Sequence, residues 1–320
     1  MAEDYIFTEN MTVGYGKMPL IAQIEIHVKR GQIVTLIGPN GAGKSTILKS
    51  IIRQIDLLGG AVYLDRASMK DMTEKQIARR MSVLMTERIR PELMTCEDVV
   101  ATGRYPYTGR LGILGREDRE KVREAMELVH AGDLGGRDFM EISDGQKQRI
   151  LLARAICQEP EAIVLDEPTS FLDIRHKLEL LTILKDLVRE KQVAVLMSLH
   201  ELDLAQKLSD YIVCVNGDTI ERLGTPEEIF TSSYITQLYG ISKGSYHAEL
   251  GCLEMEPVKG KPEVFVIGGN GSGIPVYRKL QRRGIPFAAG ILHENDIDYP
   301  VARALAAEVV SEAPFELIKD

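Results

Sequence analysis

A glycine-rich turn between a strand pattern and a helix pattern constrains this chain more than any other stretch. An apolar run at residues 33–37 leads into the turn, and a helical pattern begins near Ile47. The turn matches G-x-x-x-x-G-K-[ST] in full, and its glycines let successive backbone N–H groups point at a polyphosphate. The positive end of the following helix adds to that attraction, so the sequence predicts a nucleoside triphosphate site. The residues of this predicted site are Gly38, Pro39, Asn40, Gly41, Ala42, Gly43, Lys44, Ser45 and Thr46.

Three side chains around the turn have expected chemical roles. Lys44 supplies a point charge for the β- and γ-phosphates, and Ser45 supplies a hydroxyl for Mg²⁺. Tyr15 lies upstream, in the connection between two strand patterns. Its position leaves two interpretations open, a surface residue or an aromatic ring that stacks on adenine.

Charge and hydropathy narrow the class of protein. The chain has 320 residues and a formal net charge of −8, and it contains no Lys/Arg block, so a nucleic-acid partner is not expected. Its four scattered cysteines are typical of a reducing compartment. An acidic start without a signal-peptide pattern, and the lack of any run of about 18 apolar residues, predict a cytoplasmic protein that reaches a membrane only through a partner.

Changes of pattern along the chain suggest its organisation. Residues 1–245 have an α/β pattern, interrupted at about 88–160 by a helical subdomain, and residues 246–262 have the composition of a linker. Residues 263–320 are expected to form a small βαβ-like accessory domain. Its glycine-rich turn, residues 268–273, lacks the Lys-Ser pair, so it is interpreted as a tight βα turn or as a site where backbone amides bind a small anionic effector.

Polar residues end two of the apolar strand patterns. Asp166 and Glu167 follow residues 162–165, and His200 lies just beyond residues 193–197. The carboxyl ends of parallel strands form the edge where open α/β sheets bind ligands. Asp166 is therefore expected to hold Mg²⁺ through water, and Glu167 to activate the attacking water.

A second helix start has the character of an anion site. Ser143 is the natural N-cap of a helix that covers residues 148–157, and the exposed N-terminus of a helix attracts anions. The residues at this start are Ser143, Asp144, Gly145 and Gln146.

Taken together, these motifs resemble those of the ATP-binding cassette (ABC) ATPases in order and spacing over residues 1 to about 245. The Ile-Ser-Asp-Gly-Gln signature at residues 142–146 is the most specific of them. The resemblance implies an α/β fold: a P-loop NTPase cassette with a RecA-like core, an antiparallel β subdomain and an inserted helical subdomain. A small C-terminal α/β appendage would follow the cassette.

Pairing of two cassettes is the main implication of this resemblance. Two copies of the chain, a homodimer, would enclose two ATP molecules with Mg²⁺. Ser143 and Gly145 of one copy would contact the γ-phosphate bound to Lys44 of the other.

The resemblance also implies roles for individual residues. Glu167 would act as general base, and His200 would hold the γ-phosphate. Asp173 would link the two sites, and Tyr15 would stack on adenine.

A closer resemblance is to the importer ATPases for iron-siderophore, haem and cobalamin. Residues 101–106, Ala-Thr-Gly-Arg-Tyr-Pro, and Asp144 of the signature carry it. In that family the cassettes bind cytoplasmic loops of a transmembrane permease at the inner face of the membrane, and an extracytoplasmic binding protein delivers the cargo. The alternatives are an exporter cassette and a soluble ABC ATPase, for example in iron–sulfur assembly.

Two residues depart from the family pattern. Thr86 stands where the family has a glutamine that contacts Mg²⁺ and couples the site to the permease. Threonine is too short for both tasks, so the hypothesis is that hydrolysis persists with altered coupling. Phe171 is bulky where the family has a small residue, and the sequence offers no reason for it.

Overall fold

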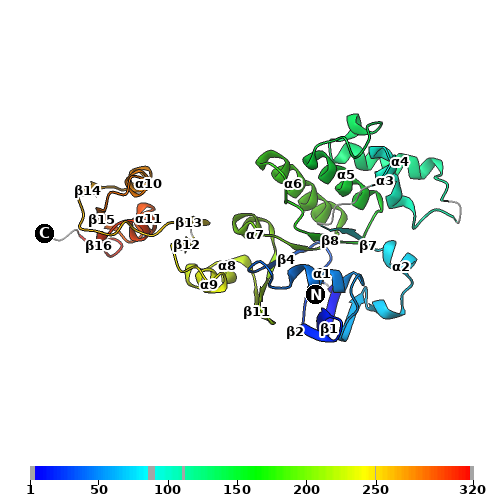
Figure 1. Ribbon diagram of the computed structural model, residues 1–320, viewed down its shortest axis with the longest axis horizontal. Coiled ribbons are helices and arrows are strands. Elements are labelled where there is room, and N and C mark those ends of the chain that lie inside the picture. Colours follow the sequence, from blue (N-terminus) through cyan, green and yellow to red (C-terminus); the bar gives the residue numbers. More distant parts are fainter. Residues whose placement is uncertain (1–3, 86–90, 110–111, 249, 318–320) are drawn as a thin grey trace. The chain divides into compact units, whose positions relative to one another are not determined.

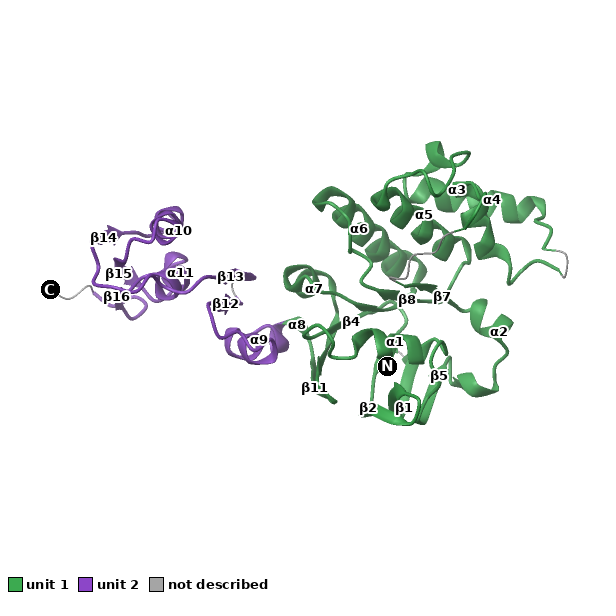
Figure 2. Cartoon of the chain, in the orientation of Figure 1, with its two compact units in different colours: residues 1–226 green, residues 227–320 purple. Residues whose placement is uncertain are grey.

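The chain forms two compact units, residues 1–226 and residues 227–320 (Figure 2). The computed structural model describes residues 4–85, 91–109, 112–248 and 250–317. The sequence suggests a linker at residues 246–262, whereas the division of the structure falls at Pro226. Part of the suggested linker is ordered as an antiparallel pair of strands, β12 (Ser245–His247) with β13 (Cys252–Glu254).

The first sheet of unit 1 is antiparallel and contains β1, the first strand of the described chain. Its order is β2-β1-β5-β6, and β3 also pairs with β1. The strands are β1 (Asp4–Tyr15), β2 (Met18–Ile24), β3 (His27–Lys29), β5 (Gly59–Leu64) and β6 (Ala67–Ser68). Buried residues of β1 and β2 join the hydrophobic core that the second sheet shares, so the two sheets form one packed body.

The second sheet has the order β11-β10-β4-β9-β8-β7, parallel from β10 to β7 and antiparallel only at β11. Its strands are β4 (Ile33–Ile37), β7 (Met81–Leu84), β8 (Ala162–Asp166), β9 (Ala194–Ser198), β10 (Tyr211–Asn216) and β11 (Thr219–Gly224). Every residue of β4, β8 and β9 is buried. That is the expected composition of central parallel strands, which are covered on both faces.

Some helices connect neighbouring strands of this sheet, and others form a group of their own, here called the helical layer, between β7 and β8. The short elements η1 (Met69–Asp71) and α2 (Glu74–Ala78) precede β7, whereas α1 (Lys44–Ile51), α6 (Ile174–Lys191) and α7 (Leu202–Leu208) follow β4, β8 and β9. Between β7 and β8 lie α3 (Cys96–Ala101), η2 (Thr102–Arg104), α4 (Arg116–Leu128), η3 (Gly132–Leu134) and α5 (Asp144–Cys157). Figure 1 shows α3, α4 and α5 gathered together, within the stretch expected to be helical.

Arg104 holds this helical group together from inside. Its side chain is 4% exposed and donates to Asp118 Oδ1 at 3.0 Å, Glu159 Oε2 at 2.9 Å and the Cys157 carbonyl at 2.8 Å. Its guanidinium also lies 4.1 Å from the centre of the Tyr107 ring. A planar donor group with several N–H groups can bind all these partners at once, which a lysine could not do.

Unit 2 ends in a small parallel sheet. After α8 (Pro226–Ile229), α9 (Ser232–Leu238) and the β12–β13 pair, β14 (Val264–Ile267), β15 (Phe287–His293) and β16 (Glu308–Glu312) pair in sequential order. They are connected by α10 (Ile274–Arg282) and α11 (Asp298–Leu305). The core of this part includes Tyr277, Phe287 and Val301.

Replacement of Arg104 by Met should destabilise unit 1 by about 2–3 kcal/mol, because the buried donor that joins Asp118, Glu159 and the Cys157 carbonyl is lost. Urea unfolding followed by circular dichroism measures this. The matched control is Arg175→Met, since the Arg175–Glu179 pair is exposed and such pairs contribute roughly 0–1 kcal/mol. Equal losses in the two variants would contradict the assigned role of Arg104.

The same cluster predicts a pH dependence. Burial raises the pKa of Asp118, but hydrogen bonds from the Gly115 N–H and from Arg104 outweigh it, so the pKa of Asp118 lies below its usual range. The pKa of Glu159 is likewise lowered by Lys121 and Arg104 against the effect of burial. A lowered folded-state pKa stabilises the fold above the unfolded pKa of about 4 and loses that effect as pH falls below it. The stability of Arg104→Met should therefore fall less than that of the wild type between about pH 5 and pH 3.

Candidate functional site

The glycine-rich turn between β4 and α1 has the backbone conformation that its sequence demands. Gly38 has φ +147°, and a Cβ there would lie 2.0 Å from the Val215 carbonyl oxygen. Gly41 and Gly43 also have positive φ, 80° and 96°. Any larger residue at Gly38 would therefore force the turn away from the neighbouring strand β10.

Lys44 lies inside this turn and is 5% exposed. Its ammonium group donates to the carbonyl oxygens of Gly38 at 2.7 Å and Pro39 at 3.0 Å. Burial lowers the pKa of Lys44, and the carboxylates of Glu167 and Asp166 act in the opposite direction. Lys44 is thus held by the carbonyls of the loop and interacts electrostatically with the carboxylates of Glu167 and Asp166.

Asp166 connects the turn to the ends of two central strands. Its Oδ1 accepts one hydrogen bond from Ser45 Oγ at 3.0 Å and another from Ser198 Oγ at 2.7 Å. Asp166 and Ser198 are register partners at the carboxyl ends of β8 and β9. A hydroxyl and a carboxylate oxygen that converge in this way are the kind of ligands that Mg²⁺ takes, so Ser45 and Asp166 fit the metal expected there.

Glu167 and His200 are brought together as a pair. His200 Nε2 is hydrogen bonded to Glu167 Oε1, and Ser170 Oγ donates to Glu167 Oε2 at 3.2 Å. The backbone N–H of Glu167 donates to Ser198 Oγ at 3.0 Å. Glu167 has φ +49°, a left-handed conformation that is uncommon outside glycine and clusters at functional sites.

Tyr15 lies at the end of β1, beside the helix that starts in the turn. Its hydroxyl and the Thr46 Oγ1 are 3.1 Å apart, and the residue is 59% exposed. The hydroxyl is thus tied to the phosphate-loop helix while much of the ring faces solvent. That arrangement leaves ring surface available for stacking.

The signature residues stand at the N-terminus of α5. Ser143 Oγ accepts from the Gln146 N–H at 3.3 Å, and the Ser143 N–H donates to Gln146 Oε1 at 3.0 Å, so a capping box begins the helix. Asp144 and Gly145 form its first turn, and a Cβ added to Gly145 would lie 3.6 Å from Leu172. These residues belong to the helical layer, whereas Lys44 and Ser45 belong to α1.

Asp173 has a local role that the structure makes clear. It is the N-cap of α6, where its Oδ1 accepts from the His176 N–H at 2.9 Å. The expected link between two nucleotide sites stays a prediction. Thr86, the position expected to contact Mg²⁺ in place of glutamine, lies outside the described residues. Phe171 is 68% exposed and has φ +66°, and nothing in the structure explains its size.

Ser198 is the site residue that the sequence interpretation did not single out. It is fully buried and contacts Asp166 and the backbone of Glu167, as described above. A signal existed, because Ser198 is the polar residue that closes an otherwise apolar buried strand. Its partners, however, lie on a strand that is about 30 residues away in sequence.

The glycine-rich turn of unit 2 is built differently. The backbone N–H groups of Gly269 and Gly273 donate to Asp298 Oδ2 at 2.6 and 2.8 Å, and that of Ile274 donates to Asp298 Oδ1 at 3.2 Å. Asp298 is fully buried. A carboxylate of the chain itself thus occupies these amides, which favours the tight-turn interpretation over binding of an anionic effector.

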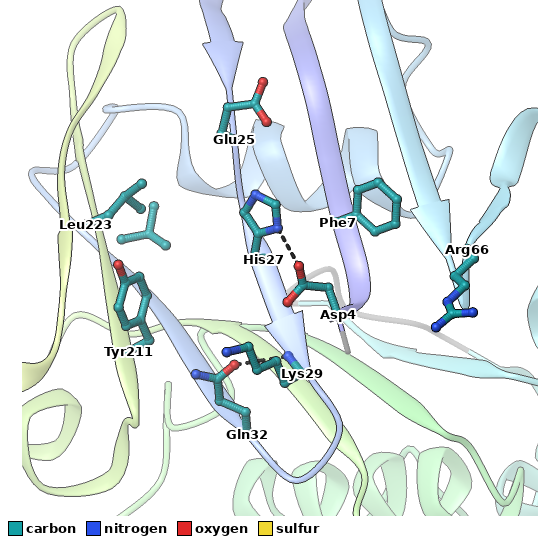
Figure 3. A pocket seen from close by; sticks show the side chains of 10 residues that line it. Asp4, Phe7, Glu25, His27, Lys29, Gln32, Arg66, Tyr211 and Leu223 are labelled. Carbon is teal, nitrogen blue, oxygen red and sulfur yellow. Dashed lines mark hydrogen bonds and ion pairs between the residues drawn. The ribbon is translucent and has the colours of Figure 1, made fainter. Parts of the chain in front are cut away.

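A further cleft of about 720 Å³ in unit 1 involves none of the predicted site residues. Figure 3 shows His27 and Asp4 paired on one side of it, with Tyr211 and Leu223 on the other. The His27 Nδ1–Asp4 Oδ2 distance is 2.8 Å. Its lining carries charges of both signs around apolar rings, so it has no clear preference for one ligand.

The phosphate loop, its lysine and the Ser45–Asp166 pair at the carboxyl edge of a parallel sheet define a P-loop nucleoside triphosphatase. Comparison with known proteins gives the family. The family model described as ABC transporter matches residues 21–170, and a second, the MJ0874 family, matches residues 287–320.

Several curated proteins are at least 30% identical in sequence to this chain and align with most of it. An uncharacterized ABC transporter ATP-binding protein of Methanocaldococcus jannaschii is 39% identical, covering 89% of this chain and 99% of that protein. The iron(3+)-hydroxamate import ATP-binding protein FhuC of Bacillus subtilis is 36% identical, covering 73% and 87%. The cobalamin import ATP-binding protein BtuD of Halobacterium salinarum is 30% identical, covering 94% and 77%.

Solved structures agree in fold. A cassette of an ABC transporter in its ADP conformation has a TM-score of 0.65 at 21% identity, covering 75% of this chain and 99% of that one. A dimeric cassette bound to ADP and Pi has a TM-score of 0.61 at 23% identity, covering 69% and 98%. The expected cassette fold is therefore confirmed.

This chain belongs to the ATP-binding proteins of ABC transporters. It is an ATPase, as the sequence motifs predict. Within the part of the chain that the structure describes, no helix has both the length and the apolar character needed to span a bilayer.

Replacement of Ser198 by Ala should lower Mg²⁺-dependent ATP hydrolysis by about 10–100-fold, because the residue that orients the carboxylate expected to bind Mg²⁺ is lost. The titration of activity with Mg²⁺ should shift to higher metal concentration. The matched control is Ser82→Ala, another buried strand serine, whose hydroxyl has no hydrogen-bond partner among the residues that the structure describes. A Ser198→Ala enzyme with the activity of Ser82→Ala and an unchanged Mg²⁺ titration would contradict this role.

Proposed function

We propose that this chain energises an ABC importer whose cargo is of the iron-siderophore, haem or cobalamin type. The observation that carries the proposal is its similarity to named import proteins over most of the cassette. Besides the two import proteins above, the ferric enterobactin transport protein FepC of Escherichia coli is 33% identical over 81% of this chain. These names favour import over the exporter and iron–sulfur assembly alternatives.

ATP would lie along the glycine-rich turn, with its β- and γ-phosphates near Lys44 and its adenine against Tyr15. Ser45 and Asp166 would hold Mg²⁺, which neutralises charge on the phosphate oxygens. Ser198 keeps the Asp166 carboxylate oriented toward Ser45. Phosphoryl transfer depends on such positioning and charge neutralisation more than on covalent chemistry.

Glu167 would accept the proton of the attacking water. In the present structure its carboxylate is hydrogen bonded to His200 and Ser170. These two bonds hold it at the carboxyl end of β8, in the sheet that also carries the phosphate loop. When ATP is bound, His200 would turn to the γ-phosphate and leave Glu167 as the base.

A second copy of the chain would complete the site. Ser143, Asp144, Gly145 and Gln146 lie on α5, in the helical layer, and their exposed helix N-terminus suits a γ-phosphate. We infer that these residues of one copy bind the ATP held by Lys44 of the other, as in a homodimer. Asp173, at the N-terminus of α6, would connect the two sites.

The permease would dock on a groove beside the helical layer. This groove of about 500 Å³ is lined by Arg53, Ile77, Gly103, Tyr105 and Arg154, among others. Tyr105 is 59% exposed there. Docking of this kind would place the chain at the inner face of the membrane, below a permease that an extracytoplasmic binding protein supplies.

The test of cargo is uptake. Cells that lack this chain should lose uptake of one among labelled ferric siderophore, haem and cobalamin, and a plasmid copy should restore it. Membranes should yield this chain together with a transmembrane permease. Normal uptake of all three in its absence would contradict the proposed cargo class.

Replacement of Glu167 by Gln should lower ATP hydrolysis by about 10²–10⁴-fold, because a general base contributes that much. Nucleotide affinity should change little, since the carboxylate is assigned to the chemical step. Steady-state hydrolysis and equilibrium binding of labelled ATP measure the two effects. The control is Glu179→Gln, a partly exposed carboxylate on α6 that pairs with Arg175. Full hydrolysis by Glu167→Gln would show that Glu167 is not the general base.

A further inference from the structure

The small sheet of unit 2 has helices on one face only. Its strand order β14-β15-β16 follows the sequence, so right-handed crossovers place both connecting helices on the same side. The shared core agrees, because Tyr277 of α10 and Val301 of α11 pack with Val266, Phe287 and Ala289 of the strands. Figure 1 shows α10 and α11 beside each other against these strands. The opposite face receives no helix from this topology.

That opposite face is apolar at its centre. Phe265 is 51% exposed, Ile267 is 79% exposed and Val310 is 49% exposed. A Cβ added to Gly290 would lie 2.9 Å from Val310 Cβ and 3.4 Å from Phe265 Cζ, so these residues share the surface around Gly290. Parallel sheets are normally covered on both faces, and this one presents large apolar side chains to solvent instead.

Acidic residues flank the apolar centre. The Glu263 N–H donates to the Pro286 carbonyl, which continues the pairing of β14 by one residue. Glu263 is two residues before Phe265, so the two side chains lie on the same face of the sheet. Glu308 and Glu312 lie two residues before and two residues after Val310 on β16, so they share its face. The three strands contain no Lys or Arg, so the charged side chains that the strands themselves place around the apolar centre, here called the rim, are acidic.

We propose that this face binds a basic amphipathic helix of a partner protein. Three strands span roughly 10–14 Å across the sheet, and a helix with its side chains is about 10–12 Å wide. One helix therefore covers the surface, with its apolar stripe on Phe265, Ile267 and Val310. Lys or Arg on its flanks then meet the glutamates of the rim.

A second copy of this chain fits the face less well. Two such faces packed together bring rim carboxylates near one another, and like charges across an interface oppose binding. The basic helix of this unit, α10, has its apolar side in its own core, where Tyr277 is fully buried. The proposal does not depend on the importer assignment, because the cassette residues take no part in it.

The experiment uses the full chain without nucleotide and a fluorescent synthetic helix of Leu, Lys and Ala, with Leu at every third or fourth position. A second peptide carries Glu in place of Lys. Fluorescence anisotropy should give about tenfold or tighter binding of the Lys peptide. The double variant Phe265→Ser/Ile267→Ser should weaken that binding by about tenfold or more and leave ATP hydrolysis unchanged.

Two further variants make the test specific. Ile174→Ser/Leu178→Ser, which removes exposed apolar side chains of α6, should bind the Lys peptide as the wild type does. Glu263→Lys/Glu308→Lys, which keeps the apolar centre, should prefer the Glu peptide. Equal binding of both peptides, or equal binding by wild type and Phe265→Ser/Ile267→Ser, would overturn the proposal. Sedimentation gives the last outcome. If the nucleotide-free wild type is a dimer and Phe265→Ser/Ile267→Ser is a monomer, the face binds a second copy of the chain instead.

Discussion

The carboxylate of Asp166 is the point on which the site in unit 1 depends. It accepts hydrogen bonds from Ser45 and from Ser198, so one oxygen joins the phosphate-loop helix to the ends of β8 and β9. Ser198 Oγ also accepts a hydrogen bond from the backbone N–H of Glu167, which fixes Glu167 relative to Asp166. The spacing between the phosphate loop and the acidic pair is thus set by two serine hydroxyls and by the register of the parallel strands.

Much of this arrangement follows from local sequence. The phosphate loop can be predicted because glycine adopts its positive φ values without steric cost, and Asp166 and Glu167 can be predicted because they close a buried parallel strand. The capping box at Ser143 is likewise a matter of four consecutive residues. Each of these signals lies within one turn or at the end of one strand.

Ser198 and Arg104 show where such reasoning stops. The partners of Arg104 come from two places: Asp118 lies on α4, and the Cys157 carbonyl and Glu159 lie at the end of α5 and just beyond it. Nothing near Arg104 in sequence indicates that its guanidinium is buried, since arginines are mostly exposed. Contacts between residues that are distant in sequence depend on how helices pack, so the local sequence around a residue does not identify its partners.

The two glycine-rich turns of the chain show why a turn motif alone does not define a binding site. Both follow a strand and precede a helix, and both contain glycines with positive φ. The turn of the cassette contains Lys44, whose ammonium group bonds the carbonyls of Gly38 and Pro39 and attracts phosphate. The turn of unit 2 instead binds the carboxylate of Asp298 through its N–H groups, and a fixed negative charge repels a phosphate from the same place. The sign of the buried charge beside the turn, which comes from Lys44 in one case and from a residue 25 positions beyond Gly273 in the other, decides whether the glycines serve a ligand or the fold.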